Sequence, residues 1–245
     1  MIRLPPTILL CLVLMGCAST GGSAGSAKPT DTSLSGLVVT VRAEPKAGFH
    51  DASEQSGVYD APSINVNPAY TRLNYDALED VVVWVETPAI ATKVQPKPVE
   101  IDVAAPPMTV VAASNDAGWI IRNTGRQREI AFVRNDFGEV VNLGSIEPGG
   151  QIETSPHLVG GWELMLDSRP EPVVRIYAAP SRLVRTTKAA RNGTTVAFRD
   201  LAPGPATVSC WHPRLPGSTA AVVLVPNEVA RASLVVTVNT LPKVK

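Results

Sequence analysis

The sequence predicts an all-β protein made of two packed β-sandwiches, and three observations carry that prediction. The 245 residues include 22 Pro and 18 Gly, which oppose long helices. Short runs rich in Val, Ile and Thr alternate with polar residues, and turn-forming Asn, Asp, Gly and Pro separate them. An apolar content of 44% is enough to bury one large core or two small ones.

The N-terminus predicts a secretory leader. Arg3 is followed by an apolar stretch over residues 8–15, which fits a signal peptide and is shorter than the roughly 20 apolar residues of a membrane span. Residues 14–17, Leu-Met-Gly-Cys, resemble a bacterial lipobox. This resemblance implies that the mature chain begins at Cys17, where acyl chains such as palmitate anchor it to the membrane. Because Ala18 is not Asp, it also implies the periplasmic side of the outer membrane.

Residues 18–35 predict a flexible tether, because they are rich in Ser, Gly, Ala and Thr and have no apolar period. Of the three cysteines, Cys11 is removed with the leader and Cys17 carries the lipid, so Cys210 has no intramolecular partner. No disulfide framework is expected.

Strand composition begins at residue 37 with Leu-Val-Val-Thr-Val and returns at residues 81–86 with Val-Val-Val-Trp-Val-Glu. Residues 44–67 between these runs have only isolated apolar side chains and predict a long loop. The Pro-rich residues 92–107 predict an extended connector or an edge strand, because each Pro removes a ladder donor. Short strands separated by turns follow between residues 108 and 178.

The last third of the chain predicts a second, smaller sandwich, because turns recur there every ~8 to 12 residues. Asn192-Gly193 predicts a hairpin, since both residues tolerate the positive φ of a type I′ turn. In residues 195–217, alternating apolar runs on either side of Pro203-Gly204 predict another hairpin. Whether the strand near residue 40 joins the first or the second unit stays open. The predicted parts are residues 1–17 (leader), 18–35 (tether), 36–180 (first domain) and 181–245 (second domain).

The segment 195–217 contains Trp-His-Pro and resembles the closing part of bacterial cupredoxin-like proteins, also described as plastocyanin-like or methylamine-utilisation-like, which carry a carboxypeptidase-regulatory-like β-module. Upstream, residues 78–85 resemble the family's Leu-x-x-Val-Val-Val-Tyr-Leu strand, and residues 121–123 its Val-x-Phe-x-Asn strand. The resemblance implies a cupredoxin-like Greek-key sandwich followed by a smaller, transthyretin-like β-sandwich. The matching positions in the last third are Thr187, Gly193, Phe198, Leu201, Pro203, Gly204, Trp211, His212 and Pro213.

The family holds a type 1 copper with two His, a Cys thiolate and a weak axial Met. Its Cys-x-x-His-Pro-x-Met motif aligns with residues 166–172, where Leu166, Arg169 and Pro172 replace Cys, His and Met. The remaining His belongs between residues 132 and 141, where this chain has none. The resemblance therefore implies a copper-free relative without a cofactor.

Cys210 and His212 are the weak alternative for a metal, because residues two apart on a strand share a face and a thiolate with an imidazole suits a soft metal. Against this, Cys210 alternates with Val208 as a small core residue. We therefore expect no metal site. His50 and His157 stand in predicted loops.

No motif supports catalysis. The Gly-x-Ser-x-Gly nucleophile elbow, the Walker A loop and Gly-x-Gly-x-x-Gly are all absent, so we expect no enzyme. A hydrolase site assembled from dispersed residues stays open as an alternative. With 5% aromatic residues the chain offers no stacking platform for nucleic acid.

Charge is unevenly distributed although the formal net charge is zero. Almost all charged residues in the segment 169–191 are basic, whereas most charged residues in the segment 51–86 are acidic. The basic segment suits a protein or cell-wall partner; alternatively, the two regions neutralise each other in the fold. The leading hypothesis is a lipid-anchored binding or assembly module, and the alternative is a periplasmic copper electron carrier. The candidate binding residues are Arg182, Arg185, Lys188 and Arg191.

Overall fold

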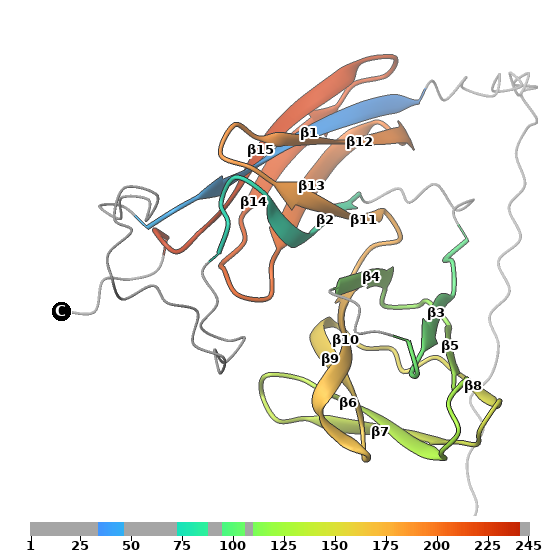
Figure 1. Ribbon diagram of the computed structural model, residues 1–245. Coiled ribbons are helices and arrows are strands. Elements are labelled where there is room, and N and C mark those ends of the chain that lie inside the picture. Colours follow the sequence, from blue (N-terminus) through green and yellow to red (C-terminus); the bar gives the residue numbers. More distant parts are fainter. Residues whose placement is uncertain (1–33, 47–72, 88–94, 106–109, 241–245) are drawn as a thin grey trace, which may run out of the picture. The chain divides into compact units, whose positions relative to one another are not determined.

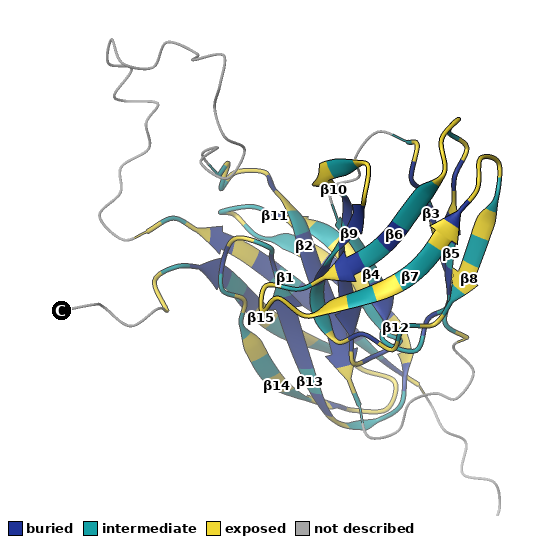
Figure 2. Cartoon of the chain, turned by 90° about the horizontal axis from the view of Figure 1, so that it is seen from below, coloured by how far each residue is buried: buried dark blue, intermediate teal, exposed yellow. Residues whose placement is uncertain are grey.

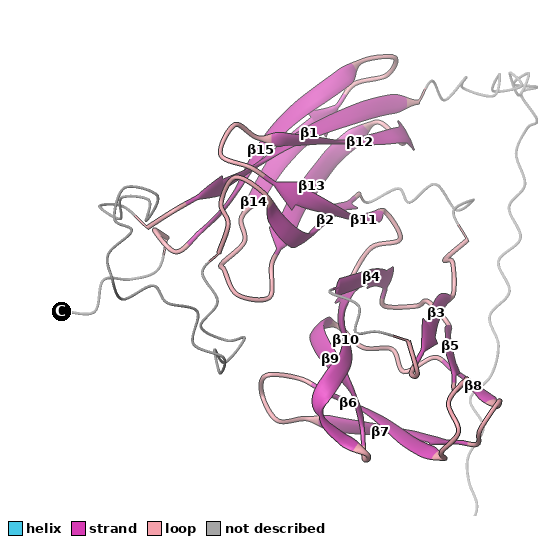
Figure 3. Ribbon diagram, in the orientation of Figure 1, coloured by secondary structure: helices cyan, strands magenta, loops and turns pink. Residues whose placement is uncertain are grey.

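The computed structural model describes residues 34–46, 73–87, 95–105 and 110–240, all of which belong to one compact unit, Thr32–Lys245. Every regular element in these residues is a β-strand (Figure 3), which confirms the all-β prediction. In the described ranges no helix is long and apolar enough to cross a membrane. The predicted leader and Cys17, most of the tether and nearly all of the predicted 44–67 loop, including His50, lie outside the described residues.

One β-sandwich, here called the terminal sandwich, has a three-stranded sheet in the order β12-β1-β15 and a four-stranded sheet in the order β11-β2-β13-β14 (Figure 1). β1 runs antiparallel to β12 and parallel to β15. The strands are β1 (Ser35–Glu44), β2 (Leu78–Glu86), β11 (Val184–Ala189), β12 (Thr194–Leu201), β13 (Gly204–Trp211), β14 (Thr219–Leu224) and β15 (Val229–Thr237).

The core of the terminal sandwich follows the alternation in the sequence. In β1 the side chains of Leu37, Val39 and Val41 are fully buried, and the residues between them are only half-buried. In contrast, β2 is buried on both faces, which explains its unbroken apolar run. Val83 packs in the core between the sheets, whereas Trp84 packs on the opposite side.

The second β-sandwich, here called the central sandwich, has a five-stranded sheet in the order β4-β10-β9-β6-β7 and a three-stranded sheet in the order β3-β5-β8. Its core is formed by Trp119, Ile121, Leu164 and Ile176, among others. The strands are β3 (Val99–Asp102), β4 (Val110–Ser114), β5 (Trp119–Arg122), β6 (Glu129–Arg134), β7 (Val140–Ile146), β8 (Gln151–Thr154), β9 (Gly160–Leu166) and β10 (Arg169–Ala179).

The strand pairing differs from the predicted division at residue 180. β2, expected in the first domain, and β1, whose unit the sequence left open, share sheets and a core with β11–β15. The central sandwich is therefore an insertion between β2 and β11. The chain leaves and re-enters at adjacent points, because the Val85 N–H donates to the Leu183 carbonyl at 3.0 Å. Such pairing between distant segments is invisible to a local pattern.

Both hairpins predicted in the last third are wrong as strand pairs. The chain does reverse at Gly193, where φ is +86°, and at Gly204, where φ is +135°. However, β11 pairs with β2, β12 pairs with β1, and β13 pairs with β2 and β14. The two turns therefore carry the chain from one sheet of the sandwich to the other.

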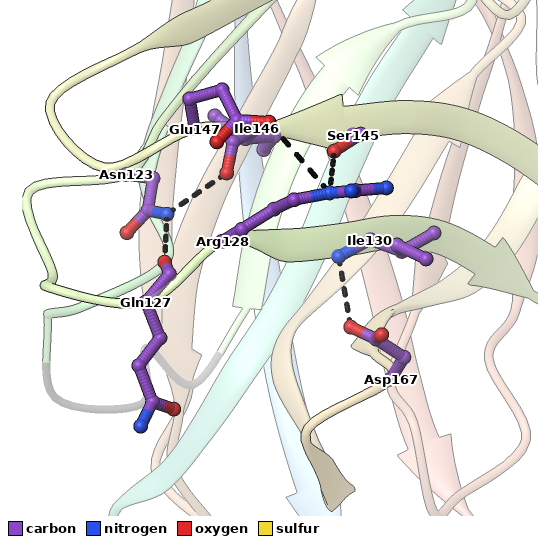
Figure 4. Close-up of polar contacts among 8 residues, drawn as sticks. All are labelled: Asn123, Gln127, Arg128, Ile130, Ser145, Ile146, Glu147 and Asp167. Carbon is purple, nitrogen blue, oxygen red and sulfur yellow. Dashed lines mark hydrogen bonds and ion pairs between the residues drawn. The ribbon is translucent and has the colours of Figure 1, made fainter.

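Asn123 closes a corner of the central sandwich (Figure 4). Its side chain is 1% exposed, and its Nδ2 donates to the carbonyls of Gln127 at 2.7 Å and Ile146 at 3.1 Å. Nearby, the Ile130 N–H donates to Asp167 Oδ1 at 2.8 Å. These bonds satisfy backbone groups where the loops leave their sheets.

An aromatic row lies between β2, β10 and β13. The rings of Trp84 and Tyr177 have centroids 5.0 Å apart, and Tyr177 stacks on Trp211 at 4.6 Å. Trp84 is buried, with 8% exposed, and Trp211 is partly buried. Burial, together with the charges of Glu86 and Cys210, raises the pKa of the Tyr177 hydroxyl to about 12.

Candidate functional site

A groove of 1430 Å³ lies along β11 and β12 of the terminal sandwich and is here called the basic groove. β11 and β12 are edge strands of the two different sheets, so one wall of the groove comes from each. Ala112 and Ser114 of β4 and residues 95–97 complete the lining. The charged residues of the lining are Lys97, Arg182, Arg185, Arg199 and Asp200.

Arg182 is held at one end of the groove by an acidic partner. Its Nε donates to Asp116 Oδ2 at 2.7 Å, and its second guanidinium contact with the same oxygen is 2.6 Å. Asp116 also accepts a bond from the Ser114 hydroxyl at 2.6 Å. This hydroxyl first, and then Arg182, hold the pKa of the Asp116 carboxyl below its usual value against the opposing effect of burial. Arg182 is thus positioned and partly neutralised.

Arg185 and Arg199 project from the edges of the two sheets, and both are exposed. The guanidinium carbon of Arg185 lies 5.7 Å from the centroid of the Phe198 ring, a cation–π distance that leaves its N–H donors available to a ligand. The groove therefore presents guanidinium groups beside the backbone edges of β11 and β12.

The other two predicted binding residues do not line the groove. Lys188 Nζ lies 2.6 Å from Glu79 Oε1, and Arg191 Nε lies 3.1 Å from Asp76 Oδ1. The bond to Glu79 raises the pKa of the Lys188 amine. These pairs join the basic segment to the acidic one, as the alternative interpretation of the charges expects. The basic segment is consequently split between the groove and ion pairs.

Cys210 lies in β13 and His212 directly follows this strand, and both residues are buried. The His212 imidazole is 5% exposed, and its Nδ1 accepts the Arg214 N–H at 3.1 Å. Burial, aided by the charges of Arg214 and Arg175, lowers the pKa of His212 to about 4. Burial raises the pKa of the Cys210 thiol, whose sulfur accepts the Ser218 N–H at 3.3 Å. Burial therefore favours the uncharged forms of both side chains. The described ranges contain no group of three or more His, Cys, Asp or Glu residues that could hold a metal.

Two of the segments aligned with the copper ligands lie in neighbouring strands. Leu166, the last residue of β9, is opposite Ala131 of β6, and the segment expected to hold the remaining His begins beside it, because Phe132 is opposite Met165. Arg169 donates from a terminal nitrogen to the Val103 carbonyl at 3.0 Å, so it closes the central sandwich. His157 is exposed in the loop before β9.

A small hollow of 60 Å³ lies beside Trp211 and Pro213. Its charged residues are largely paired with one another, because Glu163 contacts Arg134 at 3.1 Å and Arg175 at 3.3 Å. That volume holds about two water molecules. This hollow, next to the Trp-His-Pro motif, is therefore too small for a sizeable ligand.

The basic residues of the groove that the sequence did not reveal as candidates are Lys97 and Arg199. Neither stands in the basic segment, and no short motif connects them to Arg182 or Arg185. They join the groove only because two sheet edges and a connector meet there. In comparisons with known proteins, the chain matches no family model, no curated protein and no solved structure.

Proposed function

We propose that this protein is a cell-envelope lipoprotein that acts as a non-catalytic binding or assembly module, and that the basic groove is its binding surface. The observation that carries the proposal is the composition of the groove. Four basic side chains and one acidic side chain line a hollow of 1430 Å³ that runs along two sheet edges. Such a surface suits an extended acidic segment of a protein or cell-wall polymer.

The predicted anchor supports a partner that is not the membrane itself. A tether of about 18 residues has a coil dimension of roughly 20 to 25 Å, which exceeds the Debye length of about 8 Å at physiological salt. Lipid charge is then screened at the groove. We also propose that the central sandwich is a copper-free cupredoxin-like domain and that the terminal sandwich is a carboxypeptidase-regulatory-like module.

Poly-L-glutamate binding to the full chain tests the proposal. Arg185→Glu/Arg199→Glu should weaken binding by about tenfold or more at 0.15 M salt, about physiological strength, because both guanidinium groups face the groove. The matched control, Lys188→Glu/Arg231→Glu, makes the same change in net charge outside the groove lining and should bind as the unaltered chain does.

Three results would contradict parts of this proposal. Equal losses in the two variants would show that bulk charge alone attracts the polymer. Strong binding to anionic vesicles that Arg185→Glu/Arg199→Glu abolishes would make lipid the partner. Uptake of Cu(II) with an intense absorption near 600 nm, about where a type 1 site absorbs, would favour the copper electron carrier.

A further inference from the structure

Among the described strands of the terminal sandwich, β14 has the least protected sheet edge. β14 has the sequence Thr-Ala-Ala-Val-Val-Leu and pairs on one side only, with β13, among the described strands. Figure 2 shows β14 in teal and yellow beside the largely buried β13. Exposed edges are normally blunted by charges, Pro or bulges. β14 has no charge and no Pro, and its register with β13 is continuous.

The other edges of this sandwich carry charge. β11 has Arg185 and Lys188, β12 has Arg199 and Asp200, and β15 has Arg231. β13, the strand next to β14, is also uncharged. The seam along β14 is thus flanked by apolar and hydroxyl side chains, with Val223 67% exposed.

The backbone groups on the free edge can be identified from the register. The Cys210 N–H donates to the Ser218 carbonyl at 2.9 Å, so this opposed pair is a hydrogen-bonded one. Opposed pairs alternate between bonded and non-bonded in an antiparallel ladder. Thr219, Ala221 and Val223 therefore direct their N–H and C=O groups away from β13. The pairing of Val223 with Pro205, which has no N–H, agrees with this assignment.

We propose that two copies of this chain pair antiparallel through β14, around a two-fold axis at Ala221. Ala221 of one copy then lies opposite Ala221 of the other, and Thr219 lies opposite Val223. In this register the outward-directed groups of all three residues exchange reciprocal hydrogen bonds. The four-stranded sheets of the two copies become one continuous sheet.

The absence of charged residues in β14 favours a second copy of the chain as its partner. Antiparallel pairing of β14 with itself brings no charged side chains together, whereas the same pairing of β11 would gather four positive charges at one seam. A hollow of 580 Å³ beside the edge is lined mainly by apolar residues of β13 and β14, among them Pro205 and Val223, with Glu86 as its charged residue. An isologous contact of this kind closes on itself and stops at the dimer.

Disulfide trapping in the full chain, purified in a mild detergent, tests the register. Ala221→Cys should form an interchain disulfide by itself, because the Cα atoms of a bonded pair lie about 5.5 Å apart, within disulfide range. Thr219→Cys alone should not, since its two copies lie about 13 Å apart. A mixture of Thr219→Cys and Val223→Cys chains should cross-link. The unaltered chain provides the background, with Cys210 buried.

Sedimentation velocity at about 100 µM tests the dimer itself. The unaltered chain should sediment as two copies, and Ala221→Lys as one, because the two lysines lie opposite each other at the seam while the exposed position leaves the fold intact. The matched control, Ala197→Lys on the exposed face of β12, should remain a dimer. A monomeric unaltered chain, a dimer that survives Ala221→Lys, or cross-linking of Thr219→Cys alone would overturn the proposal. None of these outcomes bears on polyglutamate binding in the basic groove.

Discussion

At the residue scale, His212 couples the stability of the fold to pH. Its folded-state pKa of about 4 lies below the ordinary value of 6.5, first because it is buried and then because Arg214 and Arg175 are near. The unfolded chain therefore binds a proton more readily. The stabilisation is complete above about pH 6.5 and is lost as the pH falls toward 4. We expect urea unfolding at pH 4.5, within that window, to show a loss of about 2–3 kcal/mol relative to pH 7.

Two variants distinguish the contribution of His212 to the pH dependence of stability from that of the other titrating groups. His212→Gln should flatten the pH dependence between pH 7 and about 4.5, since a neutral amide replaces the imidazole. His157→Asn is the matched control at an exposed loop position with φ of +48°, which Asn tolerates, and should leave the dependence unchanged. An unfolding free energy of the unaltered chain that does not change over this range would contradict the prediction.

At the element scale, a glycine in β9 makes room for the ring of Trp211 from β13. Gly161 is opposite Tyr177 in the β9–β10 ladder, and a Cβ at Gly161 would lie 2.9 Å from Trp211 Cζ2. Gly161→Ala should therefore displace the Trp211 ring from Tyr177 and destabilise the protein by about 1–3 kcal/mol. Urea unfolding followed by tryptophan fluorescence measures both effects.

The control for this contact is another glycine with ordinary space. A Cβ at Gly118 would have its nearest contact at 3.8 Å, to Ser155 Oγ, so Gly118→Ala should be neutral or slightly stabilising. If Gly161→Ala proved equally neutral, the aromatic row would not contribute to stability.

At the scale of the whole molecule, the central sandwich is an insertion into a terminal sandwich that is complete without it. β2 and β11 are hydrogen-bonded neighbours, and the Ser181 hydroxyl donates to the Val85 carbonyl at the point of re-entry. Replacement of residues 88–180 by a short Gly-Ser linker should leave a folded β-sandwich with a cooperative urea transition. It should be less stable than the full chain, because Trp84 and Trp211 lose Tyr177.

Circular dichroism and the urea transition of the shortened chain check this prediction. Tyr177→Ala in the full chain is the control, because it removes the same ring while the insertion stays in place. A shortened chain without a cooperative transition would show that the terminal sandwich depends on the central one to fold.

The sequence alone determined the class of structure and many of its strands. Alternation in β1, the apolar run of β2 and the turns at Gly193 and Gly204 follow from local chemistry, because side-chain period and φ preference act over a few residues. The uninterrupted Val-Val-Val-Trp-Val of β2 even carried a signal of burial on both faces. Local chemistry also identified Arg182 and Arg185 as candidate binding residues.

Only the tertiary structure decided which strands share a sheet. A turn reverses the chain equally well within one sheet or between two, so the Asn192-Gly193 and Pro203-Gly204 signals could not distinguish these outcomes. The pairing of β1 with β15 joins residues almost 200 positions apart. It is favoured because it lets the two sheets of the terminal sandwich bury their inner faces against each other. The basic groove has the same origin, since Lys97 and Arg199 become neighbours of Arg185 only where two sheet edges meet.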